Sequence, residues 1–307
     1  MAVHDTYAAT DLPAGATARR RVRHHRSMAP LRTRLALAAA LLCVGVMASP
    51  VAHAGSPAAT TVWAVGDADL TPSGKALSTW LRARNPTRLL YLGDVYESGS
   101  GAEFARRFDP LYGAIARRVI PTPGNHEWAN HATGYDPYWL THQGRAPGPW
   151  FARHIGSWEI LSLNSEAPHA AGSSQLAWLR RATRAPGTCR IVLWHRPRWS
   201  TGWHGDQPDL APLWNAVKGH ARIVLSGHDH DLQRFADRDG LRQYVSGAGG
   251  RFNIPVTHGS GATLRFADRS NRGALRLRLS RGRAELAFIA TGGRVLDRSV
   301  TTCTPLR

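Results

Sequence analysis

Two histidines one residue apart, His228 and His230, directly follow the mostly apolar run 221–225. Side chains alternate along an extended strand, so these imidazoles would project to the same side of the chain. Paired imidazoles suit a transition-metal ion, and Gly227 gives the backbone room to turn sharply just before them. Taken alone the pattern is weak evidence, because such a pair at a strand end is more often a loop feature than a set of ligands.

Four other strand-like runs also end in groups that can bind a metal. The runs 60–65, 88–92, 118–120 and 189–194 lead in turn to Asp67 (with Asp69), Asp94, Asn125 (with His126) and His195. Core packing alone would not place ionisable groups there repeatedly, because burying them without partners costs several kcal/mol. The mixture of carboxylate, amide and imidazole favours a borderline metal such as Fe, Mn or Zn over Ca or Mg alone.

The elements that must position these groups can be read from hydrophobic periodicity. Helices are expected near 73–84, 102–116, 174–185 and 210–219, and two strands within 151–164. The segment 128–150, rich in Gly, Pro and aromatic residues, is expected to be a long irregular loop that forms one wall of a cleft. The last part reads as antiparallel strands near 241–245, 274–279, 284–289 and 295–301. The sequence therefore predicts one α/β domain with a mixed two-sheet core and helices outside, and functional groups where strands end.

The N-terminus is typical of a secretory signal peptide. Seven arginines precede the apolar run 35–47, and Ala52-His53-Ala54 is a small-x-small cleavage pattern. The apolar run is too short to span a bilayer comfortably, and Cys43 lacks the context of a lipoprotein anchor. We therefore expect a leader at 1–54, a catalytic domain at 55–307, a secreted protein, and no stable membrane anchor after cleavage.

Net charge and cysteine content say less about function than the motifs do. The net charge is +18, and because the leader has seven arginines against two aspartates, the mature part is near +13. Such a charge favours anionic partners, but the arginines are scattered without an aromatic-and-basic stripe, so specific nucleic-acid binding is not expected. Cys189 and Cys303 could form one disulfide in an oxidising compartment, a question that the sequence leaves open.

In chain order, the motifs Gly66-Asp67, Gly93-Asp94, Gly124-Asn125-His126-Glu127, His195 and Gly227-His228-Asp229-His230 resemble the calcineurin-like metallophosphoesterase superfamily. Within it, 195–200 and 203–205 are similar to a motif of the small purple acid phosphatases, and the match extends from Trp63 to Gln233. The resemblance implies a four-layer αββα fold, with a two-sheet mixed β-sandwich flanked by helices.

The resemblance also implies roles for the residues. Asp94 would bridge two metal ions, Asp67 and His230 would hold the first, and Asn125, His195 and His228 would hold the second. His126 would face the substrate as an acid or phosphate ligand, and His204 would lie on the opposite wall. The implied cofactors are two divalent or trivalent ions, Fe with Fe, Zn or Mn.

One departure from the family pattern concerns Tyr96. The purple enzymes have Gly-Asp-x-x-Tyr, whereas here Gly93-Asp94-Val95-Tyr96 is one residue shorter. Tyr96 is therefore either a ligand of the first metal, reached by a tightened loop, or a packing aromatic. Asp69 is a second candidate ligand there, in the position where non-purple relatives carry Asp-x-His.

The leading hypothesis is a secreted phosphoesterase that hydrolyses phosphomonoesters, small phosphorylated substrates, by in-line attack of a metal-bound hydroxide. An alternative within the same class is a phosphodiesterase or nucleotide hydrolase, because pocket walls rather than the metal core decide between them. A different class, a non-catalytic phosphate or polyanion binder, is disfavoured because every residue of the second metal site is present.

Overall fold

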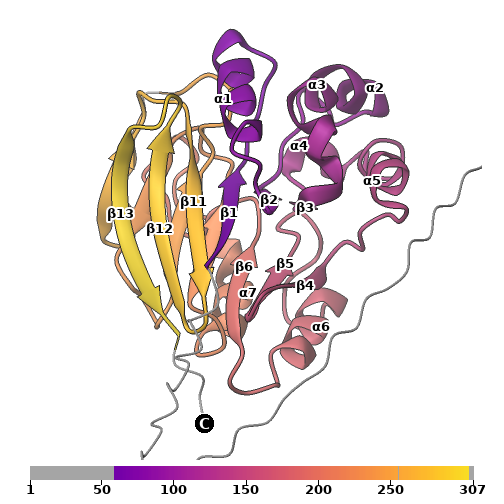
Figure 1. The fold of residues 1–307 in the computed structure, drawn as a ribbon. Helices are drawn as coiled ribbons and strands as arrows, with labels where there is room; N and C mark the ends of the chain where they lie inside the picture. The colour runs from indigo at the N-terminus through magenta and orange to yellow at the C-terminus, as the bar shows by residue number, and fades with distance from the viewer. Residues whose placement is uncertain (1–58, 255, 304–307) are drawn as a thin grey trace, which may run out of the picture. The chain divides into compact units, whose positions relative to one another are not determined.

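The computed structural model describes residues 59–254 and 256–303, so the predicted leader at 1–54 lies outside the described residues. Two β-sheets form the centre (Figure 1). The first sheet has the strand order β13-β12-β11-β1-β2-β3, and the second has the order β10-β8-β9-β7-β6-β5-β4. In the first sheet β1, β2 and β3 are parallel, and in the second β5, β6, β7 and β9 are parallel.

The bounds of the elements are as follows. The strands are β1 (Thr60–Val65), β2 (Arg88–Tyr91), β3 (Val119–Pro121), β4 (Phe151–Ile155), β5 (Trp158–Ser162), β6 (Cys189–Leu193), β7 (Ile223–Ser226), β8 (Leu232–Phe235), β9 (Arg242–Ser246), β10 (Leu264–Asp268), β11 (Gly273–Ser280), β12 (Arg283–Ala290) and β13 (Val295–Thr302). The helices are α1 (Pro72–Arg82), α2 (Gly101–Glu103), η1 (Phe104–Phe108), α3 (Asp109–Tyr112), η2 (Gly113–Arg118), α4 (Asn125–Trp128), α5 (Tyr135–Gln143), α6 (Ser174–Ala182), η3 (Pro208–Leu210) and α7 (Ala211–Val217).

Three buried apolar layers hold these elements together, because alternate residues of a strand face opposite sides of its sheet. On β1, Val62 and Ala64 join the layer between the two sheets, whereas Trp63 and Val65 face the layer under α1, α3 and α5. The third layer lies between the second sheet and the helices α6 and α7. The predicted four-layer arrangement, helices on both sides of two mixed sheets, is therefore confirmed.

The structure corrects the prediction of an irregular loop at 128–150. This segment contains α5, whose aromatic side chains Tyr138 and Trp139 pack against Phe104 and Phe108. The glycines and the proline that suggested a loop lie at its ends, since Gly134 and Gly144 flank the helix and Pro137 lies in its first turn. Aromatic packing thus stabilises a helix that the amino-acid composition of the segment does not predict.

The C-terminal third also differs from the expectation of antiparallel strands throughout. The strands β11, β12 and β13 are antiparallel as predicted, but β9 joins the second sheet parallel to β7. The short strands β8 and β10 were not predicted, because each has only four or five residues and is defined by its backbone pairing. β10 is the edge strand of the second sheet, and β8 lies between β10 and β9.

Two further features complete the fold. Cys189, at the start of β6, is joined by a disulfide to Cys303, which follows β13, and this links the two sheets. Within the described residues, no helix is long and apolar enough to cross a membrane.

Candidate metal centre

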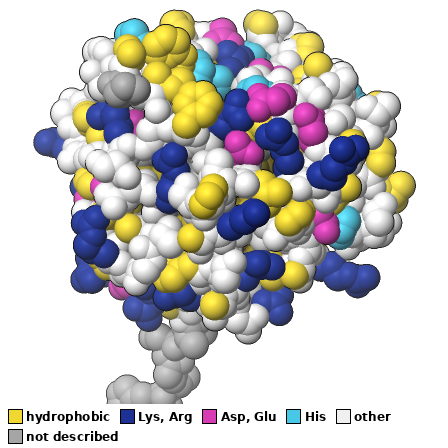
Figure 2. All heavy atoms as spheres, turned by 90° about the horizontal axis from the view of Figure 1, so that it is seen from above, with side chains coloured by type: hydrophobic (Ala, Val, Ile, Leu, Met, Phe, Trp, Pro, Cys, Tyr) yellow, Lys and Arg dark blue, Asp and Glu magenta, His cyan; other side chains and the backbone are white. Residues whose placement is uncertain are grey.

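The predicted site residues follow the carboxyl ends of parallel strands from both sheets. Asp67 follows β1, Asp94 follows β2 and Asn125 begins α4 after β3, whereas His195 follows β6 and His228 follows β7. Carboxyl ends of parallel strands meet at one edge of a sheet, so the packing of two sheets brings these loops together. At this end of the structure, histidine and acidic side chains lie close together on the surface (Figure 2).

One group of donor atoms surrounds the imidazole of His195. Its Nε2 lies 3.0 Å from Oδ1 of Asn125, 3.2 Å from Oδ1 of Asp94 and 3.2 Å from Nδ1 of His228. Its Nδ1 lies 2.7 Å from the carbonyl oxygen of Leu92, so Nδ1–H donates there and the lone pair of neutral His195 is at Nε2. The side-chain oxygens of Asn125 and Asp94 and the Nε2 lone pair of His195 therefore converge beside Nδ1 of His228, and a metal ion between them would bind all four atoms.

A second group lies around the hydroxyl of Tyr96. This oxygen is 3.0 Å from Oδ1 of Asp67 and 3.0 Å from Nε2 of His230. The Nδ1 of His230 lies 2.8 Å from the carbonyl oxygen of Phe252, which leaves the Nε2 lone pair directed at this group. Asp67 also accepts the N–H of His228 at 2.9 Å, which connects the two groups. We call the two groups together the donor cluster; its members are Asp67, Asp94, Tyr96, Asn125, His195, His228 and His230.

Asp69, the other candidate ligand, lies in different surroundings. Its carboxylate pairs with the guanidinium groups of Arg107 at 3.3 Å and Arg251 at 3.1 Å, and it accepts the N–H of Leu70. Its oxygens thus already have cationic partners, and we no longer assign it to a metal. The other candidate, Tyr96, is the one that lies beside Asp67 and His230.

Backbone conformation singles out the same residues. Asp67, Asp94 and His228 have φ angles of 58°, 70° and 72°, which L side chains rarely adopt. The glycines before two candidate ligands, Asn125 and His228, are required by close approach. A Cβ on Gly124 would lie 2.1 Å from Oδ1 of Asp94, and one on Gly227 would lie 2.5 Å from Oδ2 of Asp67. Such strained backbone is typical of functional sites.

Electrostatics show how strongly the buried groups depend on one another. Burial acts to lower the pKa of His195, yet the adjacent Asp94 carboxylate raises it to about 10. Burial lowers the pKa of His228 well below its ordinary value, and that of His230 to about 4. Burial also raises the pKa of Asp67 well above its usual range. Without a cation, protons on His195 and Asp67 thus offset the cost of their burial, whereas His228 and His230 stay neutral. A metal ion would displace those protons and bind the deprotonated groups, so the residues present fit such an ion.

The two predicted catalytic histidines lie on different walls of the donor cluster. The Nε2 of His126 is 3.7 Å from Oδ2 of Asp94, and its ring packs edge-on against Tyr96. The ring of His204 stacks on that of His228, with centroids 3.8 Å apart. Both side chains are 30% exposed, so solvent reaches them, whereas Asp67, Asp94, Tyr96, His195 and His228 of the donor cluster are buried.

Two buried carboxylates that the sequence reasoning missed support this arrangement. Glu127 accepts the N–H groups of Asp94 and Val95, each at 3.1 Å, and so fixes the loop that carries Asp94. Asp229 accepts from the N–H and from Nδ1 of His204, at 2.9 and 3.0 Å. Both residues lie inside the motifs Gly-Asn-His-Glu and Gly-His-Asp-His, and that position was the available signal.

Comparisons with known proteins agree with this geometry. A family model described as calcineurin-like phosphoesterase matches residues 63–232. The tartrate-resistant acid phosphatase type 5 of Sus scrofa is 25% identical over 214 residues, which are 58% of this chain and 62% of that protein. A probable cyclic nucleotide phosphodiesterase of Synechococcus is 29% identical over 188 residues, 57% of this chain and 69% of that protein.

Among solved structures, a purple acid phosphatase from yellow lupin seeds superposes with a TM-score of 0.63 at 15% identity, covering 80% of this chain and 54% of that one. At this identity the likeness shows the fold alone. The chain spans less than two thirds of the pig enzyme's length, whereas the family model covers more than half of the chain. The chain therefore belongs to the calcineurin-like phosphoesterase family.

Proposed function

We propose that this protein is a metal-dependent hydrolase of phosphomonoesters with two metal ions. The observation that carries the proposal is the convergence of Asp94, Asn125 and His228 on Nε2 of His195. Ligand atoms of Asp94, His195 and His228 all lie within 4.8 Å of one another, and all three residues are buried. A cation there would offset the cost of burying these groups.

The donor cluster divides into two ligand sets. Asn125, His195 and His228 would hold one ion, Asp67, Tyr96 and His230 would hold the other, and Asp94 would be shared between them. When bound, two such ions would polarise the phosphoryl group, lower the pKa of a bound water and neutralise charge in the transition state. The phenolic hydroxyl of Tyr96 has its pKa raised well above 10 by burial and by Asp67, so phenolate ligation requires a strongly charged cation.

The two wall histidines would handle the proton transfers. Nδ1–H of His204 donates to Asp229, which fixes the ring and leaves Nε2 as the atom that exchanges a proton with the substrate. His126 donates from Nδ1 to the carbonyl oxygen of Glu97, which leaves its Nε2 as the atom that would exchange a proton with a substrate on the other wall. Protonation of the leaving alkoxide by one of these imidazoles would make its departure favourable.

Secretion is part of the proposal. It is supported by the leader pattern at 1–54 and by the disulfide between Cys189 and Cys303, a bond that persists in oxidising compartments. N-terminal sequencing of the protein recovered from the culture medium should begin at Gly55. Recovery of the protein only inside cells with Ala52-His53-Ala54 intact would contradict it.

A second candidate function is phosphodiester hydrolysis on the same ligands. It is favoured by the similarity to the Synechococcus protein described as a probable cyclic nucleotide phosphodiesterase. The walls around the donor cluster, rather than the cluster itself, would decide between the two reactions.

The test combines elemental analysis, a visible spectrum and two substrates. We expect about two metal ions per chain, and faster turnover of p-nitrophenyl phosphate than of bis-p-nitrophenyl phosphate. A faster diester reaction would favour the second candidate, and a metal-free, inactive protein would overturn both. A visible charge-transfer band that is lost in Tyr96→Phe would assign the phenolate to Fe(III), whereas a colourless active enzyme would exclude that ligation.

A further inference from the structure

A pocket of about 330 Å³ lies at the edges of the two sheets, away from the donor cluster. It is lined by Arg88 at the start of β2, Arg117 at the end of η2, Arg145 after α5 and Arg153 on β4, together with His142, His154, Gln143, Val119 and Ile120. We call it the arginine pocket. No carboxylate is among the residues that line it.

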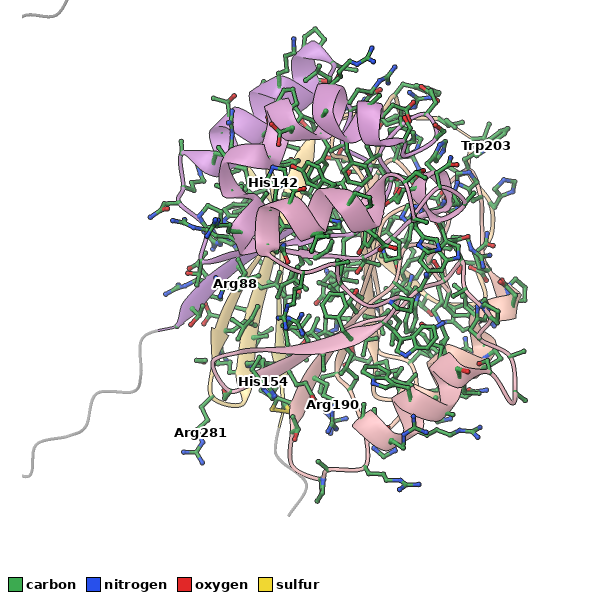
Figure 3. All side chains as sticks on the ribbon, turned by 90° about the vertical axis from the view of Figure 1, so that its right-hand side faces the viewer. Arg88, His142, His154, Arg190, Trp203 and Arg281 are labelled. Atoms are coloured by element: carbon green, nitrogen blue, oxygen red, sulfur yellow. A yellow bond between two sulfur atoms is a disulfide. The ribbon has the colours of Figure 1, made fainter. Side chains whose placement is uncertain are left out.

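The pocket and the donor cluster occupy different ends of the same strands. Arg88 is the first residue of β2, whereas Asp94 follows the end of that strand, so the two lie more than roughly 10 Å apart along it. Arg88, His142 and His154 lie on one side in Figure 3, and Trp203, which neighbours His204, lies on the other. A ligand in the pocket would therefore leave the donor cluster uncovered.

The four guanidinium groups are not neutralised by the fold. Among the described residues, Arg88, Arg117, Arg145 and Arg153 form no salt bridge; Arg88 and Arg153 donate only to the carbonyl oxygens of the residues before them. Burial and the nearby Arg145 lower the pKa of Arg153. Like charges gathered in a concave site repel one another unless an anion joins them.

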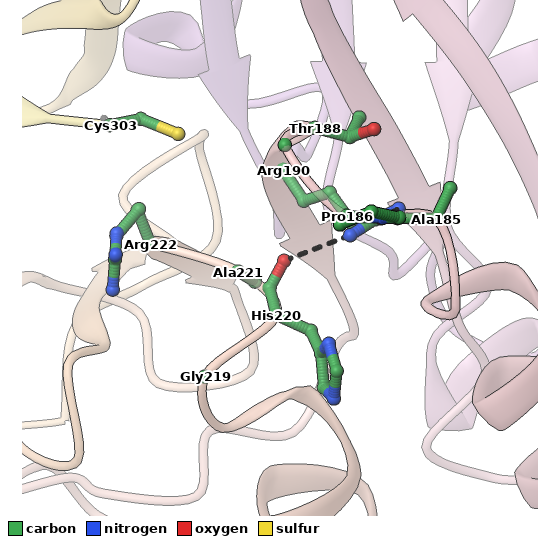
Figure 4. A pocket seen from close by; sticks show the side chains of 10 residues that line it. Ala185, Pro186, Thr188, Arg190, Gly219, His220, Ala221, Arg222 and Cys303 are labelled. Carbon is green, nitrogen blue, oxygen red and sulfur yellow. Dashed lines mark hydrogen bonds between the residues drawn. The ribbon is translucent and has the colours of Figure 1, made fainter. Parts of the chain in front are cut away.

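A smaller pocket beside the disulfide shows the usual alternative. There the guanidinium of Arg190 pairs with Glu159 at 2.6 Å and donates to the carbonyl oxygen of Ala185. It also donates to the carbonyl oxygen of His220 (Figure 4). Its charge is used within the protein, and the pocket's space of about 30 Å³ holds little more than water. The arginine pocket has the opposite properties: its guanidinium groups form no salt bridge with the residues that the structure describes, although Arg153 stacks on Phe151, and there is room for a ligand.

Edge-strand arginines have a simpler role, which is to prevent one sheet edge from pairing with another. That role explains Arg153 on the edge strand β4, but β2 is an inner strand, and Arg117 and Arg145 lie outside the strands. Convergence of four such groups from separate elements goes beyond protection of an edge.

We propose that the arginine pocket binds a small, multiply charged phosphate compound, an oligophosphate chain. A guanidinium group binds a phosphate through two parallel N–H···O hydrogen bonds. Several linked phosphates could therefore pair with several of these arginines at once. The volume lies in the range of small-ligand sites, and the open mouth suits a chain longer than a single phosphate. This proposal does not depend on the phosphoesterase activity.

The test is titration calorimetry with inorganic tripolyphosphate on the full chain carrying Asp94→Asn, which limits hydrolysis of the probe at the donor cluster. We expect saturable binding of one tripolyphosphate per chain. The double variant Arg145→Ala/Arg153→Ala should weaken it at least tenfold. The matched control Arg265→Ala/Arg281→Ala removes the same charge from exposed positions outside the pocket and should change the dissociation constant less than twofold.

Three outcomes would overturn the proposal: no saturable binding, equal weakening in the pocket and control variants, or undiminished binding when the pocket arginines are removed. Melting temperatures of both double variants should match that of the parent, because all four arginine side chains are at least partly exposed. A loss of the fold would be visible in this measurement, and the single variant Arg145→Ala, in a surface loop, would then carry the test with a smaller weakening in the same direction.

Discussion

The donor cluster and the arginine pocket lie at the two ends of the same strands, yet they use charge in opposite ways. In the donor cluster, buried acids and imidazoles contact one another and the backbone is strained at Asp67, Asp94 and His228. In the arginine pocket, the arginines stay partly exposed and have no carboxylate partner within the described part of the chain. Only the first arrangement has the mixed donors and the desolvation that chemistry on a phosphate ester requires.

The comparison teaches that net charge is a poor guide to function in this protein. The charge of +18 comes largely from arginines that are either paired, as Arg190 and Arg234 are, or dispersed over the surface. What distinguishes the arginine pocket from the other arginines is a concave surface without a carboxylate among the residues that line it. Four predictions, taken from the largest effect to the smallest, test the donor cluster, the loops that support it and the disulfide at the opposite end.

The largest effect is expected for Asp94→Asn. An amide removes the charge that both ligand sets share, so kcat for p-nitrophenyl phosphate should fall at least ~1,000-fold, roughly 4 kcal/mol of transition-state stabilisation. Bound metal, measured by elemental analysis, should fall with it. The control Asp237→Asn, in an exposed pair with Arg242, should leave kcat unchanged. Full activity of Asp94→Asn would exclude the shared role.

The next largest effect concerns stability at the end opposite the donor cluster. Replacing Cys189 and Cys303 by serine opens a loop of 114 residues and should lower the free energy of unfolding by about 3 kcal/mol. The melting temperature should fall by about 6–12 °C, while kcat at 25 °C stays the same. A matching loss of kcat in the folded variant would show that the two ends are coupled.

A smaller effect on catalysis is expected for Glu127→Gln. Glu127 does not belong to the donor cluster but accepts two N–H groups of the loop that carries Asp94. An amide turns one acceptor into a donor that faces an N–H, so kcat should fall about 10- to 100-fold. Metal content should fall less than in Asp94→Asn. If kcat were unaffected, positioning of Asp94 by Glu127 would be excluded.

The smallest effect is a pH dependence at Glu103, which supports the loop beside the donor cluster. Burial opposes ionisation, but the N–H groups of Ser100 and Glu97 lower the pKa of Glu103 from 4.5 to about 2. Its carboxylate therefore stabilises the fold above about pH 4.5, and this contribution is lost as the pH falls towards 2.

Glu103 accepts the N–H of Ser100, the residue that caps the start of α2. Glu103→Gln should consequently lower the free energy of unfolding by about 1 kcal/mol at pH 7, the usual contribution of such a helix cap. Urea unfolding from pH 7 down to pH 3 should show the difference between parent and variant narrowing. A difference that stays constant over this range would contradict ionisation of Glu103 as its source.

Much of the fold and of the site could be predicted from the sequence, because the relevant signals are local. Apolar runs marked β1, β2, β6 and β7, and the residue types after them placed the candidate ligands at strand ends. Helix α5 could not be predicted, since its stability comes from aromatic contacts with residues far away in the sequence. Strands β8 and β10 were also missed because they depend on distant contacts: backbone pairing with other strands, rather than their own composition, defines them.

The sequence by itself determined which donor atoms are available and which strand each follows, because motif spacing and strand periodicity are properties of neighbouring residues. Only the tertiary structure decided which of them meet. It placed Tyr96 beside Asp67 and His230, paired Asp69 with arginines instead, joined Cys189 to Cys303, and gathered four arginines from separate elements. The physical reason is that contacts between distant segments depend on how the two sheets pack, which no local pattern encodes.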